Sequence, residues 1–264
     1  MIARIIAGLL LAAAIAIVAR AARSLTTSGA IAATVVGTAA VAAGWSWGAL
    51  LIAYFVSSSA LSRVGRDAKL AHTQSVIEKT GARDAVQVLA NGGVFALAAL
   101  VGIVHHDTIW LAAGAGALAA SAGDTWGTEL GTLYGGTPRS LLTLRPVPPG
   151  TSGGVSVVGT VSSILGAGFV AALALALGWG ARPSAFALAG GVTGAFADSL
   201  TGALFQARRH CDVCGIETER MTHDCGAATR HARGIAWLDN DGINLLATLG
   251  GAIVAAGLTR VVAA

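Results

Sequence analysis

The chain has 264 residues, of which 55% are hydrophobic and 11% are charged, and its formal net charge is +4. Soluble domains carry about 25% charged residues, so this composition excludes a disordered segment, a nucleic-acid-binding arm and a secreted disulfide scaffold. The 36 glycines beside only 5 prolines are typical of transmembrane helices, which pack closely through small residues. The sequence therefore predicts an all-α integral membrane protein.

Eight apolar stretches approach or exceed the length of about 20 residues that a membrane-spanning helix needs. They are residues 2–19, 25–43, 45–62, 91–105, 108–123, 153–178, 185–205 and 242–260. The fourth and fifth are short, and a re-entrant pair is the alternative for them. The first resembles a signal peptide, but arginines follow it where a small-residue cleavage motif is expected. We expect a polytopic protein with seven or eight transmembrane helices in one domain, residues 1–264.

Lysine and arginine predict the orientation in the membrane. Arg20, Arg23 and the segments 63–90, 124–152 and 206–241 hold all but three of the 17 basic residues, and only Arg4, Arg182 and Arg260 fall on the other side. By the positive-inside rule, these segments face the cytoplasm and both termini lie outside. Every acidic residue except Asp107 is on the same side. We therefore expect the site at the cytoplasmic interface of the cytoplasmic membrane.

Acidic residues mark three places on this side of the membrane. Asp124 and Asp198 lie at the inner ends of the fifth and seventh predicted spans, and Asp239 and Asp241 precede the last one. A carboxylate at the membrane edge is costly unless it is paired, hydrated or metal-bound, so each is a site candidate. Helix capping is the simpler explanation for Asp239 and Asp241. It does not fit Asp124 and Asp198, which we expect at helix C-terminal ends, where the helix dipole disfavours negative charge.

Glycines recur at four-residue spacing beside both acids, at positions 123, 127, 131 and 135 and at positions 190, 194 and 202. Residues four apart share one helix face, and helix packing explains most of these glycines. Asp198 stands at the missing position of the second series, four residues after Gly194 and four before Gly202. Helix packing does not explain an acid within a row of small residues, so Asp198 favours a functional site.

A Gly-rich segment, PPGTSGGVS at 148–156, enters the sixth predicted span. Its glycines free the backbone, and the helix start behind them offers unpaired amides to a phosphate, although many such turns bind nothing. Arg83, Gln87 and Asn91 form a polar stripe, which is either a solvated face or the side of a polar cavity. Acids for a divalent cation, a Gly-rich helix start and arginines are the components of phosphoryl or nucleotidyl transfer.

Five blocks in fixed order carry a family resemblance: QVLANGG at 87–93, GDTWGTELG at 123–131, PPGTSGGVS at 148–156, ADS at 197–199, and WLDND at 237–241 with Asn244. Together they resemble the transmembrane protein 19 family, whose plant member is the chloroplast phytyl-phosphate kinase. The resemblance covers residues 78–244. A more distant similarity is to the CTP-using membrane enzymes dolichol kinase and phosphatidate cytidylyltransferase, but Pro148 and Pro149 stand where those enzymes have a lysine pair.

The resemblance implies a phosphotransferase that converts a prenyl monophosphate, of the phytyl or geranylgeranyl phosphate type, to the diphosphate. Its partners would be a Mg²⁺-bound nucleoside triphosphate, with CTP expected, a prenyl phosphate lipid and the membrane, but no nucleic acid; a homodimer is left open. The expected catalytic residues are Asp124, Asp198, Asp241 and Arg83. The expected Mg²⁺ ligands are Asp124, Glu129, Asp198, Asp239 and Asp241. The expected nucleotide- and phosphate-binding residues are Lys79, Asn91, Thr128, Arg139, Gly150, Thr151, Ser152, Gly153, Gly154 and Asn244. Arg139 or Arg145 would neutralise a phosphate together with Arg83.

Two other functions fit the same residues. One is a CTP-dependent lipid cytidylyltransferase. The other is a membrane transporter or scramblase whose acids carry ions or protons. Clustering of the acids at one interface disfavours transport, because transporter sites usually lie near the middle of the bilayer.

A Cys/His loop at 206–236 is inserted between the last two predicted spans. Cys211, Cys214, His223 and Cys225 form a CxxC followed by HxC, which supplies four ligands suited to tetrahedral Zn²⁺. His210 and His231 are substitutes, and the alternative is a flexible loop with incidental thiols. On the cytosolic side the thiols stay reduced, so a closed site would be structural.

Overall fold

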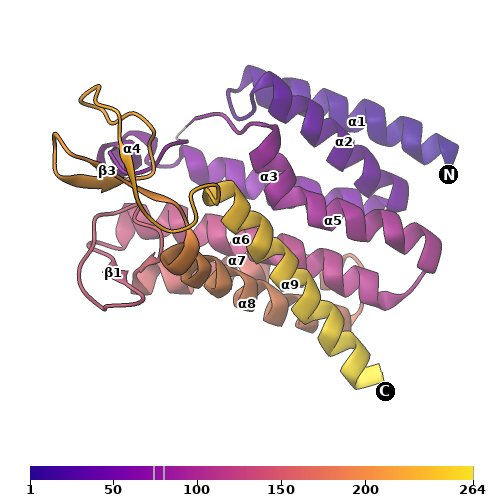
Figure 1. Ribbon diagram of the computed structural model, residues 1–264. Helices are drawn as coiled ribbons and strands as arrows, with labels where there is room; N and C mark the ends of the chain where they lie inside the picture. Colours follow the sequence, from indigo (N-terminus) through magenta and orange to yellow (C-terminus); the bar gives the residue numbers. More distant parts are fainter. Residues whose placement is uncertain (74, 80, 264) are drawn as a thin grey trace.

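The computed structural model describes residues 1–73, 75–79 and 81–263, and the chain is mostly helical. Figure 1 shows the long helices side by side in one bundle. The helices are α1 (Ile2–Ala21), α2 (Thr27–Ala43), α3 (Trp45–Arg63), α4 (Arg66–Thr73), α5 (Ala85–His105), α6 (Thr108–Tyr134), α7 (Val157–Ala176), α8 (Ala181–Phe205) and α9 (Asn240–Ala263). Each apolar stretch predicted from the sequence falls on a helix, and α4 is an additional short one.

Length and composition support four or five membrane spans. The helices α1, α5, α7 and α9 are long and apolar enough to cross a membrane, and α3 with α4 adds a fifth candidate if this pair, bent by 72°, is one span. Large apolar side chains such as Leu10, Ile17, Val104 and Ile253 are exposed on these helices. Exposure of this kind fits contact with lipid. The chain is therefore a polytopic helical membrane protein, and the count of eight spans stays a prediction.

The central helix of the bundle is α6, which packs against α3, α5, α7, α8 and α9. Its residues 109 and 112–123 are buried, and most of them are alanine or glycine. A Cβ on Gly116 would lie 2.6 Å from the carbonyl oxygen of Gly251 in α9, and a Cβ on Gly190 of α8 would lie 2.3 Å from the same atom. Small residues thus allow three backbones to meet, which confirms packing as the explanation for Gly190. A helix of small residues has modest hydropathy, although residues 112–123 of α6 are all buried.

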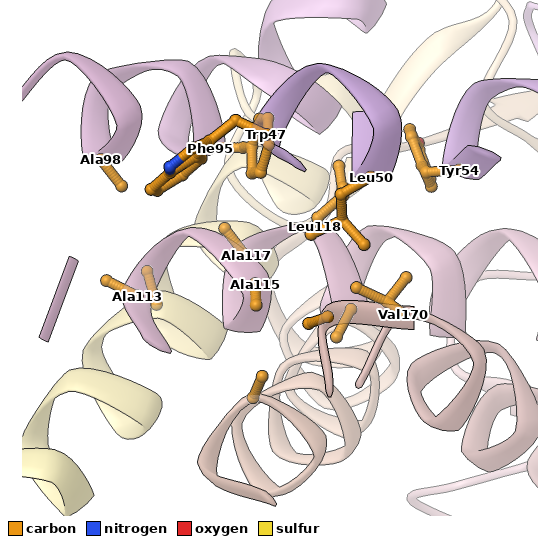
Figure 2. Packing of buried hydrophobic residues seen from close by; sticks show 14 of the residues in the cluster. Trp47, Leu50, Tyr54, Phe95, Ala98, Ala113, Ala115, Ala117, Leu118 and Val170 are labelled. Atoms are coloured by element: carbon orange, nitrogen blue, oxygen red, sulfur yellow. The ribbon is translucent and has the colours of Figure 1, made fainter. Parts of the chain in front are cut away.

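The apolar core lies between α3 and the helices that surround α6 (Figure 2). Trp47 packs against Phe95 with their ring centroids 5.1 Å apart, and against Trp179 at 4.5 Å. Leu50 of α3 and Leu118 of α6 are fully buried in the same cluster. These large side chains fill the space that the alanine-rich helices leave beside α3.

The strands and α4 lie at one end of the bundle, and both termini lie at the other (Figure 1). The strands β1 (Arg139–Ser140) and β2 (Gly154–Val155) pair antiparallel. The strands β3 (Arg208–Cys211), β4 (Ile216–Thr218) and β5 (Arg230–Arg233) form an antiparallel sheet in the order β4-β3-β5. An all-α class is therefore too simple, because two small sheets join the helices. The segments that the basic residues assigned to one side do lie at the same end.

Two helix starts differ from the predicted boundaries because side chains cap them. The helix α5 begins six residues before position 91, since Asp84 accepts a hydrogen bond from the Gln87 amide at 3.0 Å and the Gln87 side chain accepts one from the Asp84 amide. This gives α5 the full length of a span. The helix α7 begins after position 153, because Ser156 caps it by accepting from the Gly159 amide at 3.1 Å.

The end of α6 also differs, and the positions of two acids within their helices correct an argument made from the sequence. Asp124 and Asp198 were expected at C-terminal helix ends, but α6 continues to Tyr134 and α8 to Phe205. No proline interrupts either stretch, and α6 ends only at the glycine pair 135–136. The helix-dipole argument is therefore wrong, and both carboxylates lie in helix interiors.

Candidate active site

A cavity of about 640 Å³ lies at the strand-bearing end of the bundle. It is bounded by α3, α4, α6, α8, the start of α9, the Gly-rich loop (residues 148–154) and the ribbon (residues 206–236, which hold β3, β4 and β5). Pockets for small molecules usually measure roughly 300–1,000 Å³, so the cavity can hold a nucleotide-sized ligand.

Most of the predicted site residues line this one cavity. They are Lys79, Arg83, Asn91, Asp124, Thr128, Glu129, Gly150, Thr151, Ser152, Gly153, Gly154, Asp198, Asp239, Asp241 and Asn244. Arg139 is the exception, because it lies in β1 and its guanidinium donates to the Leu144 carbonyl at 2.9 Å instead. Arg145 is exposed and lies outside the cavity as well.

Asp124 and Asp198 form a carboxylate pair between the adjacent helices α6 and α8. Their carboxyl groups lie close enough to interact directly, and the Thr128 side chain lies near Asp124. The Asp198 Oδ2 atom is buried without a hydrogen-bond partner among the described residues. Within the same residues, neither carboxylate forms an ion pair with a lysine or arginine. Two facing carboxylates with free oxygens are ligands that suit a hard divalent cation.

Glu129 and Asp239, also predicted as Mg²⁺ ligands, have other partners. Glu129 forms an ion pair with Lys69 of α4 and accepts a hydrogen bond from Ser62 at 2.5 Å. The Lys69 ammonium also donates to the Leu61 carbonyl at 2.8 Å. Asp239 accepts from the Gly242 amide at 3.0 Å, so it caps the start of α9, as the simpler explanation had it.

Lys79 links two acids at the edge of the cavity. Its ammonium lies 2.5 Å from Asp241 and 2.9 Å from Asp84. Partial burial lowers the pKa of Lys79, but the hydrogen bonds to both acids outweigh this effect and raise the pKa above its ordinary value. Asp241 is buried, and its Oδ1 has no partner among the described residues. One oxygen of Asp241 is therefore neutralised, and the other stays available to a ligand.

Arg83 is positioned by backbone hydrogen bonds between distant segments. Its amide donates to the Ser24 carbonyl at 3.0 Å, and its carbonyl accepts from the Thr26 amide at 3.0 Å. The guanidinium donates to Ser62 at 3.3 Å and lines the cavity. Arg83, two residues before α5, thus directs a fixed positive charge into the site.

Sequence reasoning missed several basic residues of the cavity. Arg23, Arg63, Arg66, Lys69 and Arg209 also line it. Their sequence signal was visible, since three of them lie within residues 63–69, but membrane orientation already explained them. A cavity with so many cations beside two unpaired carboxylates can bind a polyanion together with a metal ion.

The Gly-rich loop reaches the cavity in a conformation that only its glycines allow. Gly153 has φ +73°, and a Cβ there would lie 2.3 Å from the Ala203 Cβ of α8. The loop therefore docks directly on the helix that carries Asp198. Arg208 of the ribbon donates to the Ser152 carbonyl at 3.2 Å from the other side.

The ribbon contributes a buried ion pair next to the cavity. Arg208 is almost fully buried, and its guanidinium lies 3.3 Å from the Glu219 carboxylate. Burial raises the pKa of Glu219 to about 7, although Arg208 opposes this effect. Burial also lowers the pKa of Arg208. Arg209 and Glu219 both line the cavity, so the ribbon forms part of its wall.

The predicted Cys/His ligands come together at the far side of the ribbon. One ligand atom from each of Cys211, Cys214, His223 and Cys225 lies within 4.8 Å of the others. The substitute residues His210 and His231 are not part of this group. The hydrogen bond with His223 lowers the pKa of the Cys225 thiol to about 6, while the hydrogen bond with Cys225 raises the pKa of Cys214 to about 11.

A second, apolar groove of about 90 Å³ lies beside the cavity. It is formed by α1, α2, α3 and α5, with side chains such as Leu11, Ile15, Leu51 and Phe55. Arg83, Gln87 and Asn91 line both the groove and the large cavity. The polar stripe predicted from the sequence is therefore the junction between a polar and an apolar compartment.

These features define a class, that of polytopic helical membrane proteins with a charged cavity at one end of the bundle. The chain matches the family described as "Integral membrane protein DUF92" over residues 10–252, and it belongs to this family. The family resemblance drawn from the five sequence blocks is thereby confirmed. No solved structure matches the chain significantly.

Curated relatives cover most of the chain. It is 31% identical to Protein PGR of Arabidopsis thaliana over 255 residues, which is 86% of this chain and 86% of that protein. It is 30% identical to Protein VTE6, chloroplastic, from the same plant over 240 residues, which is 88% of this chain and 64% of that protein. An uncharacterized membrane protein of Methanocaldococcus jannaschii is 29% identical, with 95% of this chain and 92% of that protein covered.

The pairing of Glu129 with Lys69 yields a test of its role. The side chains of Lys69 and Glu129 are only 10% and 20% exposed, so Glu129→Gln leaves a largely buried ammonium without its counter-charge. We expect the free energy of unfolding to fall by about 1.5–3 kcal/mol, the range for hydrogen bonds to charged groups. Thermal unfolding in detergent measures the change.

The matched control is Glu217→Gln, which removes an exposed ion pair with Arg233. This change is expected to alter stability by less than about 1 kcal/mol. If Glu129→Gln proves as mild as the control, the ion pair is not structural, and Glu129 returns to the set of candidate cation ligands.

Proposed function

We propose that this protein is a phosphotransferase that converts a prenyl monophosphate to the diphosphate, with a Mg²⁺-bound nucleoside triphosphate as donor. One observation carries the proposal. A single cavity combines two neighbouring carboxylates, which have no lysine or arginine partner among the described residues, with a Gly-rich loop and a set of basic side chains. The relationship to VTE6 and the resemblance to the phytyl-phosphate kinase family support it. The cavity end of the bundle faces the cytoplasm in this proposal, following the basic residues.

The reaction requires the protein mainly to position the substrates and to stabilise their charge. The second pKa of a phosphate monoester is about 6, so the acceptor oxygen is already ionised near pH 7 and needs no general base. This oxygen attacks the γ-phosphorus, a new P–O bond forms, and the bond to the bridging oxygen breaks. The bonding electrons leave with the nucleoside diphosphate. Catalysis of this kind depends on alignment and electrostatic stabilisation.

The residues of the cavity divide these tasks. Asp124 and Asp198 would hold Mg²⁺, which neutralises charge on the donor phosphates when it is bound. The free Oδ1 of Asp241 lines the same cavity, but among the described residues it does not join the pair in one three-ligand group. The Gly-rich loop offers hydroxyls from Thr151 and Ser152 to the donor phosphates. Arg83 would bind the acceptor phosphate, because it alone among the arginines lining the cavity also lines the apolar groove.

The apolar groove suits the tail of the lipid acceptor. Its polar end is Arg83, Gln87 and Asn91, so a phosphate bound there has its ester carbon directed toward α1, α2, α3 and α5. A prenyl chain placed in this groove leaves the bundle on the side of α1 and α5, two helices apolar enough to contact lipid. The arrangement joins an acceptor from the membrane to a donor from the aqueous side.

The donor is proposed to be CTP because of the similarity to dolichol kinase and phosphatidate cytidylyltransferase. The same similarity supports a lipid cytidylyltransferase as the second candidate. Purified protein in detergent with Mg²⁺, geranylgeranyl phosphate and CTP labelled at either the α- or the γ-phosphate separates the two. Label from the γ-phosphate in the lipid is the expected result, and label from the α-phosphate establishes nucleotidyl transfer instead. No transfer from CTP, ATP, GTP or UTP to short or long prenyl phosphates contradicts both.

The carboxylate pair gives the sharpest variant test. Asp124→Asn and Asp198→Asn keep the shape of each side chain and remove its charge, so each is expected to lower kcat about 100-fold or more. Binding of the Mg²⁺-nucleotide weakens as well, while thermal unfolding in detergent shows a folded protein. Asp107→Asn is the control, since it caps α6 at the opposite end and asparagine caps equally well. Full transfer by either cavity variant refutes the metal-binding role.

A second variant tests the position of the lipid tail. Ile52 of α3 lines the groove, and Ile52→Trp should displace part of a bound chain. Excluding two methylenes removes about 1.6 kcal/mol, so KM for geranylgeranyl phosphate is expected to rise about tenfold or more with kcat nearly unchanged.

Val56→Trp is the matched control, because Val56 lies one turn further along α3, is exposed and does not line the groove. Dimethylallyl phosphate, which has one isoprene unit, should lose much less than the long acceptor. Equal KM values for the long acceptor in both variants place the tail elsewhere.

A further inference from the structure

The ribbon has too little apolar core to hold its own fold. Its buried residues are Gln206, Arg208, Cys211, Thr218, His223 and Thr229, nearly all of them polar. Units of fewer than about 40 residues usually need a disulfide, a metal ion or oligomerisation for stability. The three cysteines are all free, so disulfides do not supply this stability.

The four Cys/His side chains gather near the spacing of a tetrahedral metal site, with one ligand atom from each within 4.8 Å of the others. The Cys211 and Cys225 sulfurs are 3.6 Å apart, and the His223 Nδ1 atom is 3.3 Å from the Cys225 sulfur. Zinc bonds of about 2.3 Å to sulfur and about 2.0 Å to nitrogen put neighbouring ligands of a tetrahedron roughly 3.5–3.8 Å apart. A disulfide between two of these cysteines would not explain why the third cysteine and the histidine lie in the same group.

Two tight turns bring the ligands together. Cys211 ends β3, and its carbonyl accepts from the Gly215 amide at 2.8 Å in a turn that Gly215 closes with φ +68°. The second turn is one residue shorter and also closes on a glycine, since the His223 carbonyl accepts from the Gly226 amide at 2.8 Å and Gly226 has φ +83°. Each turn therefore supplies two ligands from one side of the site.

We propose that Cys211, Cys214, His223 and Cys225 bind one structural Zn²⁺ ion, which holds the ribbon against the cavity. Four protein ligands fill a tetrahedral zinc, so no position stays open for a substrate, and the ion takes no part in the chemistry. The thiols lose their protons on binding, as zinc–thiolate sites require.

The ion acts on the cavity through a short chain of contacts. Arg208 lies in β3, three residues before Cys211, and joins Glu219 to the Ser152 carbonyl of the Gly-rich loop. On the neighbouring side, the Glu219 amide and the Thr218 hydroxyl both donate to the Val76 carbonyl, at 2.8 and 3.2 Å. Loss of the ion frees β3 and β4, and with them the contacts that position the loop.

Metal content of the full-length protein tests the site directly. Protein purified in detergent without metal-affinity resin is expected to carry one zinc per chain by elemental analysis. Cys225→Ser and His223→Ala should carry almost none. His210→Ala and His231→Ala are matched controls from the same ribbon and should keep the metal. Absence of zinc from the wild-type protein, even after reloading, overturns the proposal, and so does zinc that is retained by Cys225→Ser.

Cobalt exchange keeps the test valid if a variant fails to fold. Wild-type protein loaded with Co²⁺ should show the visible absorption of a tetrahedral cobalt–thiolate site, and Zn²⁺ should abolish it. Hydrogen exchange of the wild-type protein with and without chelator then tests the coupling. Faster exchange in the ribbon and in residues 148–154, with α5 and α6 unchanged, is expected. Exchange that rises only in the ribbon refutes the coupling to the loop, independently of any phosphotransferase activity.

Discussion

Two carboxylates that face each other between central helices are the constraint on which the rest of this structure depends. Asp124 and Asp198 lie in the interiors of α6 and α8, where like charges at short range repel strongly and water is scarce. Such a pair needs water, a cation or a shared proton to offset the repulsion, and the cavity beside it gives access to water and to a cation. The glycines that bring α6, α8 and α9 into backbone contact deeper in the bundle place the two acids side by side at its edge.

The surrounding charges are sorted between structural pairs and free groups. Lys69 is held by Glu129 and Lys79 by Asp241 and Asp84, so these lysines offer little charge to a ligand. Among the described residues, the Arg83 guanidinium donates only to the Ser62 hydroxyl, at 3.3 Å, and keeps most of its donors for an anion. The positive charge that reaches the cavity therefore comes chiefly from arginine. Arginine suits phosphate because its planar fork of donors binds two oxygens at once.

Much of the helical fold and most of the site residues could be predicted from the sequence, for separate reasons. Apolar stretches of span length predict helices because the backbone must satisfy its own hydrogen bonds in lipid. The five sequence blocks could be recognised because an acid flanked by glycines is an uncommon combination beside an apolar span. Helix boundaries were less predictable, since they depend on single caps such as Asp84 and Ser156. The continuation of α6 past Asp124 had no marker at all beyond the absence of proline.

Partners that are distant in the sequence could not be foreseen. Glu129 was expected to bind a cation, but its counter-charge lies 60 residues earlier, on a short amphipathic helix. Arg139 is basic and lies in a segment at the cavity end of the bundle. The pairing of β1 with β2, however, places its guanidinium against the Leu144 carbonyl outside the cavity. Both differences arise from tertiary contacts. Composition and spacing carry no information about those contacts.

The division of the molecule into compartments follows from where each part finds its stability. The helices are stabilised by lipid and by close packing, and the apolar groove between α1, α2, α3 and α5 belongs to that environment. The ribbon lies outside it and buries few apolar groups, so it depends on its polar contacts and, under the proposed zinc site, on Cys211, Cys214, His223 and Cys225. The cavity lies between the two, and Arg83 on one side and Arg208 on the other connect it to each. For the proposed reaction, this division would let an apolar acceptor bind from the bundle side and a polyanionic donor from the ribbon side.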